Sequence, residues 1–484
     1  MLESCVVNPQ QILKSSLFYT VVQYLVLGIG FIKGIYIARY LGPALMGSYG
    51  LILLVLEYLR FSNLGISSAM NLEVSVNRSR EEKREYVECV INTAFSYILV
   101  VALLLGIAAL LVHFLFSSWV ASEVLTYLFA IFYIAFVGQM KLFCVVYARL
   151  YQKYRFINLI EFVSAAILCM LVVLLVADYR LDAVIGSMIV SSTLTLVLCF
   201  LLVRGRVQFH LGVRLLRSLA VVGVPLLVYN LCEKVFQTID RLMIVHFLTR
   251  EDLGYFTLAY TVLSNTLLIL GSFTYLQYPR FLEKFNISNY PQESRGELFH
   301  DLKRYSSSLS GVCIGITIVG LLLIEPFIRI LLPAYAPSIL LYRILIVGIV
   351  FDVIAYFASA FLVSNKHQIL LIVTLAVASL VAAGLNLVAL RSGWGLAGIA
   401  VATTISMALY AALKVSLVLR KIGQFSLQNL AAFYSKYLLF LLLLVPLMIG
   451  YPSYLFLAVP VFLVIYFSDL SQLARKLRLA MEVS

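Results

Sequence analysis

One stretch of the sequence, Leu219–Tyr260, restricts the fold more than any other part of the chain. Roughly its first thirty residues are apolar enough to cross a bilayer, since about 20 residues at about 1.5 Å each span the hydrocarbon. At roughly 100° per residue, its polar side chains fall within an arc of about 160°. This polar stripe consists of Asn230, Glu233, Lys234, Gln237, Thr238, Asp240 and Arg241.

The polar stripe cannot face lipid, because each charge at the bilayer centre costs about 3 kcal/mol or more. We therefore expect it to face protein or a water-filled cavity, as in the interior of a transporter. The composition agrees: of 484 residues, 63% are hydrophobic and only 12% are charged. With a mean hydropathy of +1.01, the chain is predicted to be a polytopic α-helical membrane protein.

Fourteen membrane spans are predicted, an even number that places both termini on one side. If that side is cytoplasmic, cytoplasmic segments hold about 24 lysines and arginines and external loops about five, which agrees with the positive-inside rule and accounts for most of the net charge of +13. The predicted location is a bacterial inner membrane, with both termini cytoplasmic. The spans are 16–38, 45–66, 91–113, 120–144, 157–177, 183–203, 219–248, 253–277, 307–325, 339–363, 368–390, 394–419, 434–450 and 452–468.

An internal repeat is visible. Ile37–Leu51 aligns with Ile244–Leu258, so that Gly47 corresponds to Gly254. Six helices separate the copies, so the halves run parallel about an axis normal to the membrane. The sequence predicts two pseudo-symmetric six-helix bundles around a central cavity, plus two C-terminal helices. The expected domains are 1–203, a linker at 204–218, a second bundle at 219–419, and an appendage at 420–484.

Three motifs carry a resemblance to a known family: YIARYLGPALMGSYGL from Tyr36, IDRLMIVHFLTREDLGYFTLAY from Ile239, and GWGLAGIAVATTIS from Gly393. They resemble the polysaccharide transporter family, whose members are Wzx-type flippases for O-antigen and capsule repeat units. The resemblance implies alternating access that moves an undecaprenyl-diphosphate-linked oligosaccharide outward, with H⁺ or Na⁺ antiport as an option. Its candidate partners are a polysaccharide polymerase and a chain-length regulator. No cofactor, metal or nucleic acid is expected.

The candidate substrate-binding residues are cations, because a diphosphate crossing hydrocarbon needs positive charge and arginine offers phosphate a bidentate fork. Arg60, Lys234 and Arg241 are the central candidates. Lys33, Arg39 and Arg343 lie nearer the external face. Two alternatives stay open: Glu57–Arg60 and the charges of the polar stripe fasten helices together, or the outer cations, with Lys141, Glu161 and Lys414, extend to the headgroups.

The acids Glu57, Glu233, Asp240 and Asp352 are candidates for binding a coupling ion. The first two and Asp352 lie near the predicted midplane, where burial raises a carboxyl pKa towards neutrality. The repeat also places Lys33 opposite Asp240, which suggests a latch on the external side.

The sequence also bears on four alternative functions. A glycosyltransferase or polymerase is disfavoured, because the predicted external loops are short and neither metal-ligand spacing nor a Walker motif is present, so no catalytic residue is assigned. A drug or small-cation antiporter should have a net acidic interior, whereas the membrane-embedded charges here are mildly basic. A lipid II-type flippase and a scaffold in a glycan-assembly complex remain alternatives.

Overall fold

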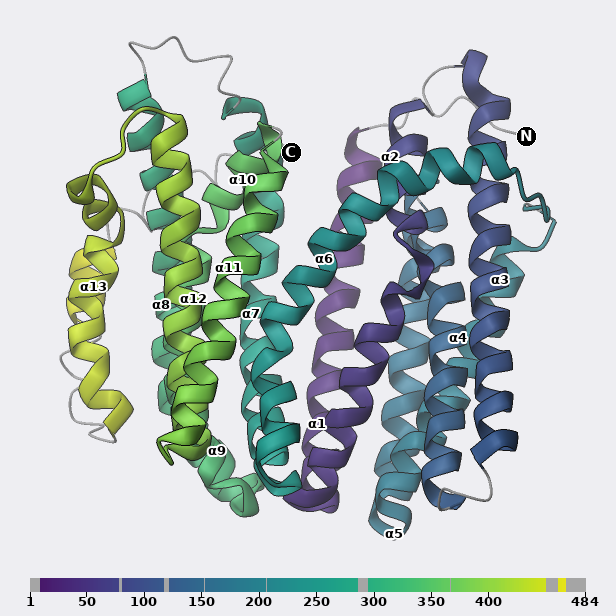
Figure 1. Ribbon diagram of the computed structural model, residues 1–484, viewed down its shortest axis with the longest axis horizontal. Helices are drawn as coiled ribbons and strands as arrows, with labels where there is room; N and C mark the ends of the chain where they lie inside the picture. The colour runs from purple at the N-terminus through teal and green to yellow at the C-terminus, as the bar shows by residue number, and fades with distance from the viewer. Residues whose placement is uncertain are drawn as a thin grey trace. The chain divides into compact units, whose positions relative to one another are not determined.

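The computed structural model describes residues 9–77, 81–116, 122–151, 153–205, 207–285, 295–365, 367–449 and 460–466. Over this part of the chain the regular structure is helical throughout, and the chain divides into two compact units (Figure 1). Unit 1 comprises Met1–Leu41 and Ser48–Leu231. Unit 2 comprises Gly42–Gly47 and Cys232–Ser484.

Unit 1 is built from long apolar helices. Its core is formed where α3, α4 and α5 pack together around residues such as Ile98, Phe143 and Ile160, which are fully buried. The elements that supply its residues are α1 (Pro9–Leu59), the 3₁₀ turn η1 (Arg60–Asn63), α2 (Ile66–Asn77), η2 (Glu81–Lys83), α3 (Arg84–Phe116), α4 (Ser122–Leu150), α5 (Tyr154–Val203) and the first part of α6 (Val213–Phe247).

Unit 2 begins within α6 and has α9 at its centre, in contact with α7, α8 and α12. Figure 1 shows α11 and α12 side by side in green. The Tyr437 hydroxyl of α13 donates to the Val347 carbonyl of α9 at 2.9 Å, which fixes α13 to this unit. The remaining elements are α7 (Arg250–Lys284), α8 (Arg295–Leu331), η5 (Pro333–Tyr335), α9 (Pro337–Ile354), α10 (Tyr356–Ser364), α11 (Gln368–Arg391), α12 (Gly395–Lys421) and α13 (Leu427–Ile449).

Two of the helices each contain a sharp turn. In α1 the turn is at Gly42, whose φ of 70° suits glycine and which precedes Pro43. The turn lies between the predicted spans 16–38 and 45–66. In α5 the turn is at Arg180, with φ 46°, within the charged stretch 178–182 that separates the predicted spans 157–177 and 183–203. Each of these helices therefore holds two of the predicted spans.

The fold class is confirmed: the protein is an all-α polytopic membrane protein. Within the described residues, nine helical stretches are long and apolar enough to span a membrane, and two of them, Val21–Asn63 and Tyr154–Val203, contain a turn and cover two predicted spans each. The predicted spans 253–277, 434–450 and 452–468 fall on stretches whose side chains are described only in part, and their described backbone is helical.

The glycines that match in the repeat meet in space. A Cβ atom on Gly47 would collide with the Arg250 carbonyl, and one on Gly254 would collide with the Pro43 carbonyl. The two contacts are reciprocal, because Pro43 and Arg250 occupy equivalent positions of the repeat. Only glycine allows the backbones of α1 and α7 to approach this closely. The repeat is therefore structural, with a pseudo-twofold relation at this contact.

The start of α7 is stabilised by a capping box. The Thr249 hydroxyl accepts a hydrogen bond from the Asp252 amide at 3.2 Å, and the Asp252 carboxylate accepts one from the Thr249 amide at 3.1 Å. This box occupies the LTRED part of the repeat motif, so the local sequence itself sets where α7 begins after α6 ends.

Candidate functional site

The polar stripe of α6 becomes more buried along its length. Asn230 is exposed, whereas Thr238, Asp240 and Arg241 are buried. Between them, Glu233, Lys234 and Gln237 are half-buried. The part of the stripe that lies in unit 2 is therefore turned towards protein, as its charge requires.

Asp240 is held within unit 2 by two hydrogen bonds. One carboxylate oxygen accepts from the Arg241 backbone amide at 2.7 Å. The other accepts from the Thr403 hydroxyl of α12 at 3.5 Å. Thr403 lies in the GWGLAGIAVATTIS motif, so two of the motifs singled out in the sequence contact each other here. The proposed latch with Lys33, which belongs to unit 1, stays a prediction.

Arg241 is a buried cation whose side chain is only partly bonded. It is 7% exposed. Its guanidinium stacks on the Tyr260 ring of α7 at 4.4 Å from the centroid, and Nη2 donates to the Gln237 carbonyl at 3.2 Å. The buried Nε has no hydrogen-bond partner. Among the described carboxylates none forms an ion pair with Arg241, although the adjacent Asp240 carboxylate interacts with its charge.

A second charged cluster in unit 2 joins α6, α9 and α12. Lys414 Nζ of α12 lies 2.6 Å from Asp352 Oδ1 of α9 and over the Tyr410 ring at 4.2 Å. The Lys414 side chain is 4% exposed. The alternative in which Lys414 extends to the headgroups is therefore wrong, because its ammonium pairs with Asp352 and its side chain is buried in the bundle. Glu233 lies within electrostatic range of both residues.

Arg343, a candidate substrate cation, is paired in the structure. Its Nη2 lies 2.6 Å from a Glu325 carboxylate oxygen of α8, and Arg329 contacts the other oxygen at 2.8 Å. The sequence analysis did not include Glu325 among the candidates. Glu325 is the last residue of the predicted span 307–325, and Arg329 lies in the loop predicted to follow that span. An acid at a helix end four residues before an arginine was the available signal.

The candidates of unit 1 lie along α1 and at its end. Lys33 and Glu57 are half-buried, and Arg39 is exposed three residues before the Gly42 turn. Arg60 is exposed and opens η1, where the helix ends. The structure thus brings Glu233 and Asp352 together, whereas Lys33, Glu57 and Arg60 lie in the other unit.

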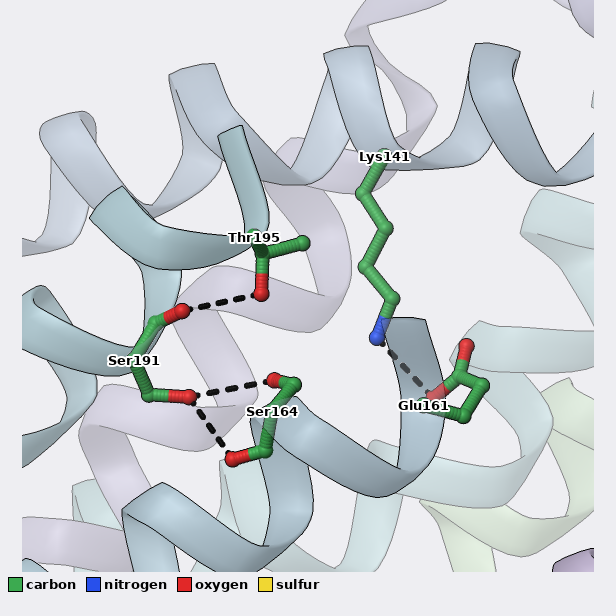
Figure 2. A network of polar contacts seen from close by, with 5 residues as sticks. All are labelled: Lys141, Glu161, Ser164, Ser191 and Thr195. Atoms are coloured by element: carbon green, nitrogen blue, oxygen red, sulfur yellow. Dashed lines mark hydrogen bonds and ion pairs between the residues drawn. The ribbon is translucent and has the colours of Figure 1, made fainter. Parts of the chain in front are cut away.

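Figure 2 shows a polar network inside unit 1 that links α4 to both arms of α5. Lys141 Nζ of α4 lies 3.0 Å from Glu161 Oε2, and both side chains are about three-tenths exposed. The Ser164 and Ser191 hydroxyls lie 3.0 Å apart, and Thr195 donates to the Ser191 carbonyl. Lys141 and Glu161 therefore neutralise each other across two helices.

The fold and these buried charges define a polytopic α-helical membrane protein with charged residues inside its helical bundles. A family model described as "Polysaccharide biosynthesis protein" matches residues 12–285, which is more than half of the chain. The chain belongs to the polysaccharide biosynthesis protein family. Among curated proteins no sequence matches it.

Solved structures with the same fold are transporters of the multidrug/oligosaccharidyl-lipid/polysaccharide exporter (MOP) superfamily. The lipid II flippase MurJ, in an inward closed conformation, has a TM-score of 0.67 at 15% identity, covering 95% of this chain and 99% of its own. An inward-facing multidrug resistance MATE transporter has a TM-score of 0.65 at 13% identity, covering 82% and 94%. A MOP-superfamily transporter from Pyrococcus furiosus, described by the reverse polarity of its binding pocket, has a TM-score of 0.60 at 13% identity, covering 84% and 93%.

Proposed function

We propose that this protein is a flippase that moves an undecaprenyl-diphosphate-linked oligosaccharide, an O-antigen or capsular repeat unit, to the outer leaflet by alternating access. Membership in the polysaccharide biosynthesis protein family supports a glycan substrate. The observation that carries the proposal is Arg241, a buried guanidinium in unit 2 that forms no ion pair with a described carboxylate.

A diphosphate is the chemical group that best matches this arginine. Phosphate oxygens accept two parallel N–H hydrogen bonds from one guanidinium, and their negative charge balances the positive charge of the buried arginine. One face of the Arg241 guanidinium packs on the Tyr260 ring, with the guanidinium carbon 4.4 Å from the ring centroid. This stacking fixes the direction in which the N–H groups of the guanidinium point. Lys234, seven residues earlier on the same stripe, and Arg60 in unit 1 are the further cations that we assign to the diphosphate.

The alternative of a cation antiporter is less well supported. An antiporter for drug cations needs acids that are free to meet the substrate. Here Asp352 is engaged by Lys414, and Glu325 by Arg343 and Arg329. Asp240 accepts hydrogen bonds from Thr403 and a backbone amide. The described ion pairs thus occupy acids in unit 2, while Arg241 keeps donor capacity.

A lipid II-type flippase is the second candidate, and the extent of the structural likeness favours it. The match with MurJ covers 95% of this chain, whereas the two other similar structures cover 82% and 84%. Both flippase proposals share a diphosphate on a polyprenyl lipid, so they assign the same role to Arg241 and differ in the glycan.

The experiment is transport of fluorescent lipid-linked oligosaccharides by purified protein in proteoliposomes, with and without a pH or Na⁺ gradient. We expect Arg241→Gln to lower the transport rate at least tenfold. A tenfold change corresponds to about 1.4 kcal/mol, and the loss of a hydrogen bond to a charged phosphate costs at least about that much free energy. Arg241→Lys should retain part of the activity, since it keeps the charge but loses the fork.

Arg391→Gln, at the exposed end of α11, is the matched control and should transport at the wild-type rate. If Arg241→Gln also transports at that rate, the assignment of the diphosphate site is wrong. Preference for a lipid-linked peptide-bearing disaccharide would favour the lipid II-type reading, and export of organic cations without flipping would favour the antiporter.

A further inference from the structure

The cluster around Lys414 contains more oxygen donors than its single ammonium uses. Asp352 of α9 receives the Lys414 ammonium at 2.6 Å through one carboxylate oxygen. The Tyr434 hydroxyl of α13 is buried without a hydrogen-bond partner, and the Asp352 charge acts on it. Glu233 of α6 interacts electrostatically with Asp352, Lys414 and Lys234. We call Glu233, Asp352, Lys414 and Tyr434 the α12 lysine cluster.

The Lys414 ammonium contacts Asp352 and the Tyr410 ring of its own helix. The Tyr410 ring lies 4.2 Å from its ammonium, and the Phe236 ring of α6 lies 5.1 Å from the Tyr410 ring. Lys414 is 4% exposed, whereas the Asp352 side chain is 54% exposed. The acid is therefore accessible from outside the bundle, but the charge that balances it is anchored within the protein.

Asp352 pairs directly with Lys414, and Glu233 and the buried Tyr434 hydroxyl, from two further helices, interact electrostatically with this acid. Oxygen atoms of these kinds are the ligands that a hard cation prefers. A free cation would have to compete for these oxygens with the Lys414 ammonium, which is covalently attached to α12 and cannot diffuse away. If the ammonium were removed, the same oxygens would carry uncompensated negative charge in a membrane-embedded bundle, which strongly favours capture of a small cation.

We propose that Lys414 is a tethered counter-cation: it occupies, at the Asp352 carboxylate, the place that a free alkali cation would take. The wild-type cluster consequently needs no Na⁺, and removal of the ammonium converts the cluster into a Na⁺ site. The inference concerns which cation unit 2 uses, and it does not depend on the identity of the transported glycan.

The test is thermal unfolding of the full-length protein in detergent, in NaCl or in choline chloride at the same ionic strength. The variant is Lys414→Met, which preserves the length of the side chain without its charge. For wild type we expect the same unfolding midpoint in both salts. For Lys414→Met we expect a lower midpoint in choline chloride and a rise of about 2 °C or more in NaCl, because a ligand that binds only the folded state stabilises it.

Two further variants locate the effect. Asp352→Asn with Lys414→Met should abolish the response to Na⁺, and Tyr434→Phe with Lys414→Met should weaken it. Lys141→Met removes the other described lysine–carboxylate pair between helices, with Glu161 (Figure 2). It should show no response, because the described ion pair there leaves a single carboxylate when the ammonium is removed.

Three outcomes would overturn the proposal. A Na⁺-specific rise in wild type would show that the cluster already binds a free cation. Lys414→Met that is folded and insensitive to Na⁺ would show that Lys414 only fastens α12 to α9. An equal response in Lys141→Met would show a general effect of a broken ion pair. If Lys414→Met does not fold, Lys414→Gln replaces it and is judged by the same midpoints.

Discussion

Gln139 shows how one side chain maintains a break in a membrane helix. It is 2% exposed, and its amide nitrogen donates to the Leu59 carbonyl at 2.9 Å, the Arg60 carbonyl at 3.2 Å and the Ser62 hydroxyl at 2.9 Å. Its carbonyl accepts from Asn63 at 3.2 Å. These groups lie where α1 ends in η1, and the helix itself cannot satisfy its last carbonyls.

Gln139→Ala should therefore destabilise the protein substantially. Each buried carbonyl left without a donor costs about 1–3 kcal/mol. Unfolding in a denaturing detergent, followed by circular dichroism, measures the loss. The matched control is Gln428→Ala at an exposed position of α13, which should change stability little. Equal stability of the two variants would mean that the end of α1 does not depend on Gln139.

Single residues also show where sequence reasoning ends. Burial of the Thr238–Arg241 end of the polar stripe was predictable, because charge and helical spacing are both present in the sequence. The partner of Lys414 was not, because depth judged from the ends of a span ignores what the neighbouring helix offers. Asp352 lies 62 residues away. Tyr260 and Thr403 were missed for the same reason, since nothing in their own segments marks them as contacts of Arg241 and Asp240.

At the scale of elements, the contact between α1 and α7 depends on glycine at two equivalent positions. Gly254→Ala adds a Cβ atom that would collide with the Pro43 carbonyl and lie close to the Gly47 amide. The two helices must then move apart, because the colliding atoms belong to the backbone and cannot rotate away as the end of a side chain can. We expect a lower unfolding midpoint and less folded protein in the membrane fraction.

Gly384→Ala is the matched control for this prediction. Gly384 lies in α11 with no neighbouring atom within 4 Å of a Cβ atom, so the same chemical change meets open space. It should leave stability unchanged or raise it slightly, because alanine favours helix. If Gly254→Ala is as stable as this control, the close approach of the two helices is not required.

The turns within the long helices were predictable to different degrees. Gly42 followed by Pro43 is a strong local signal, and the structure turns there with φ 70°. Arg180 has φ 46°, a conformation that non-glycine residues rarely adopt. The local signal is the charged stretch 178–182, which interrupts two apolar runs and separates the predicted spans 157–177 and 183–203. It predicts a break in this stretch, but no glycine or proline marks which residue adopts the turn.

At the scale of the whole molecule, orientation in the membrane follows from charge rather than from packing. Basic residues concentrate in alternate connections, which predicts cytoplasmic termini. The two ends of α11 test this directly, because a helix of 24 residues is long enough to place His367 and Ser392 on opposite sides. His367 belongs to a predicted cytoplasmic connection and Ser392 to an external one.

We expect a cysteine at Ser392 to react with a membrane-impermeant maleimide added to intact cells, and one at His367 to react only after permeabilisation. The background must lack the native cysteines, because Cys89 is a free and exposed thiol in the described part of the chain. Gel shift with a polymer-linked maleimide gives the reacted fraction. The opposite pattern would place the lysine- and arginine-rich connections outside, and the direction of transport proposed for the oligosaccharide would then have to be reversed.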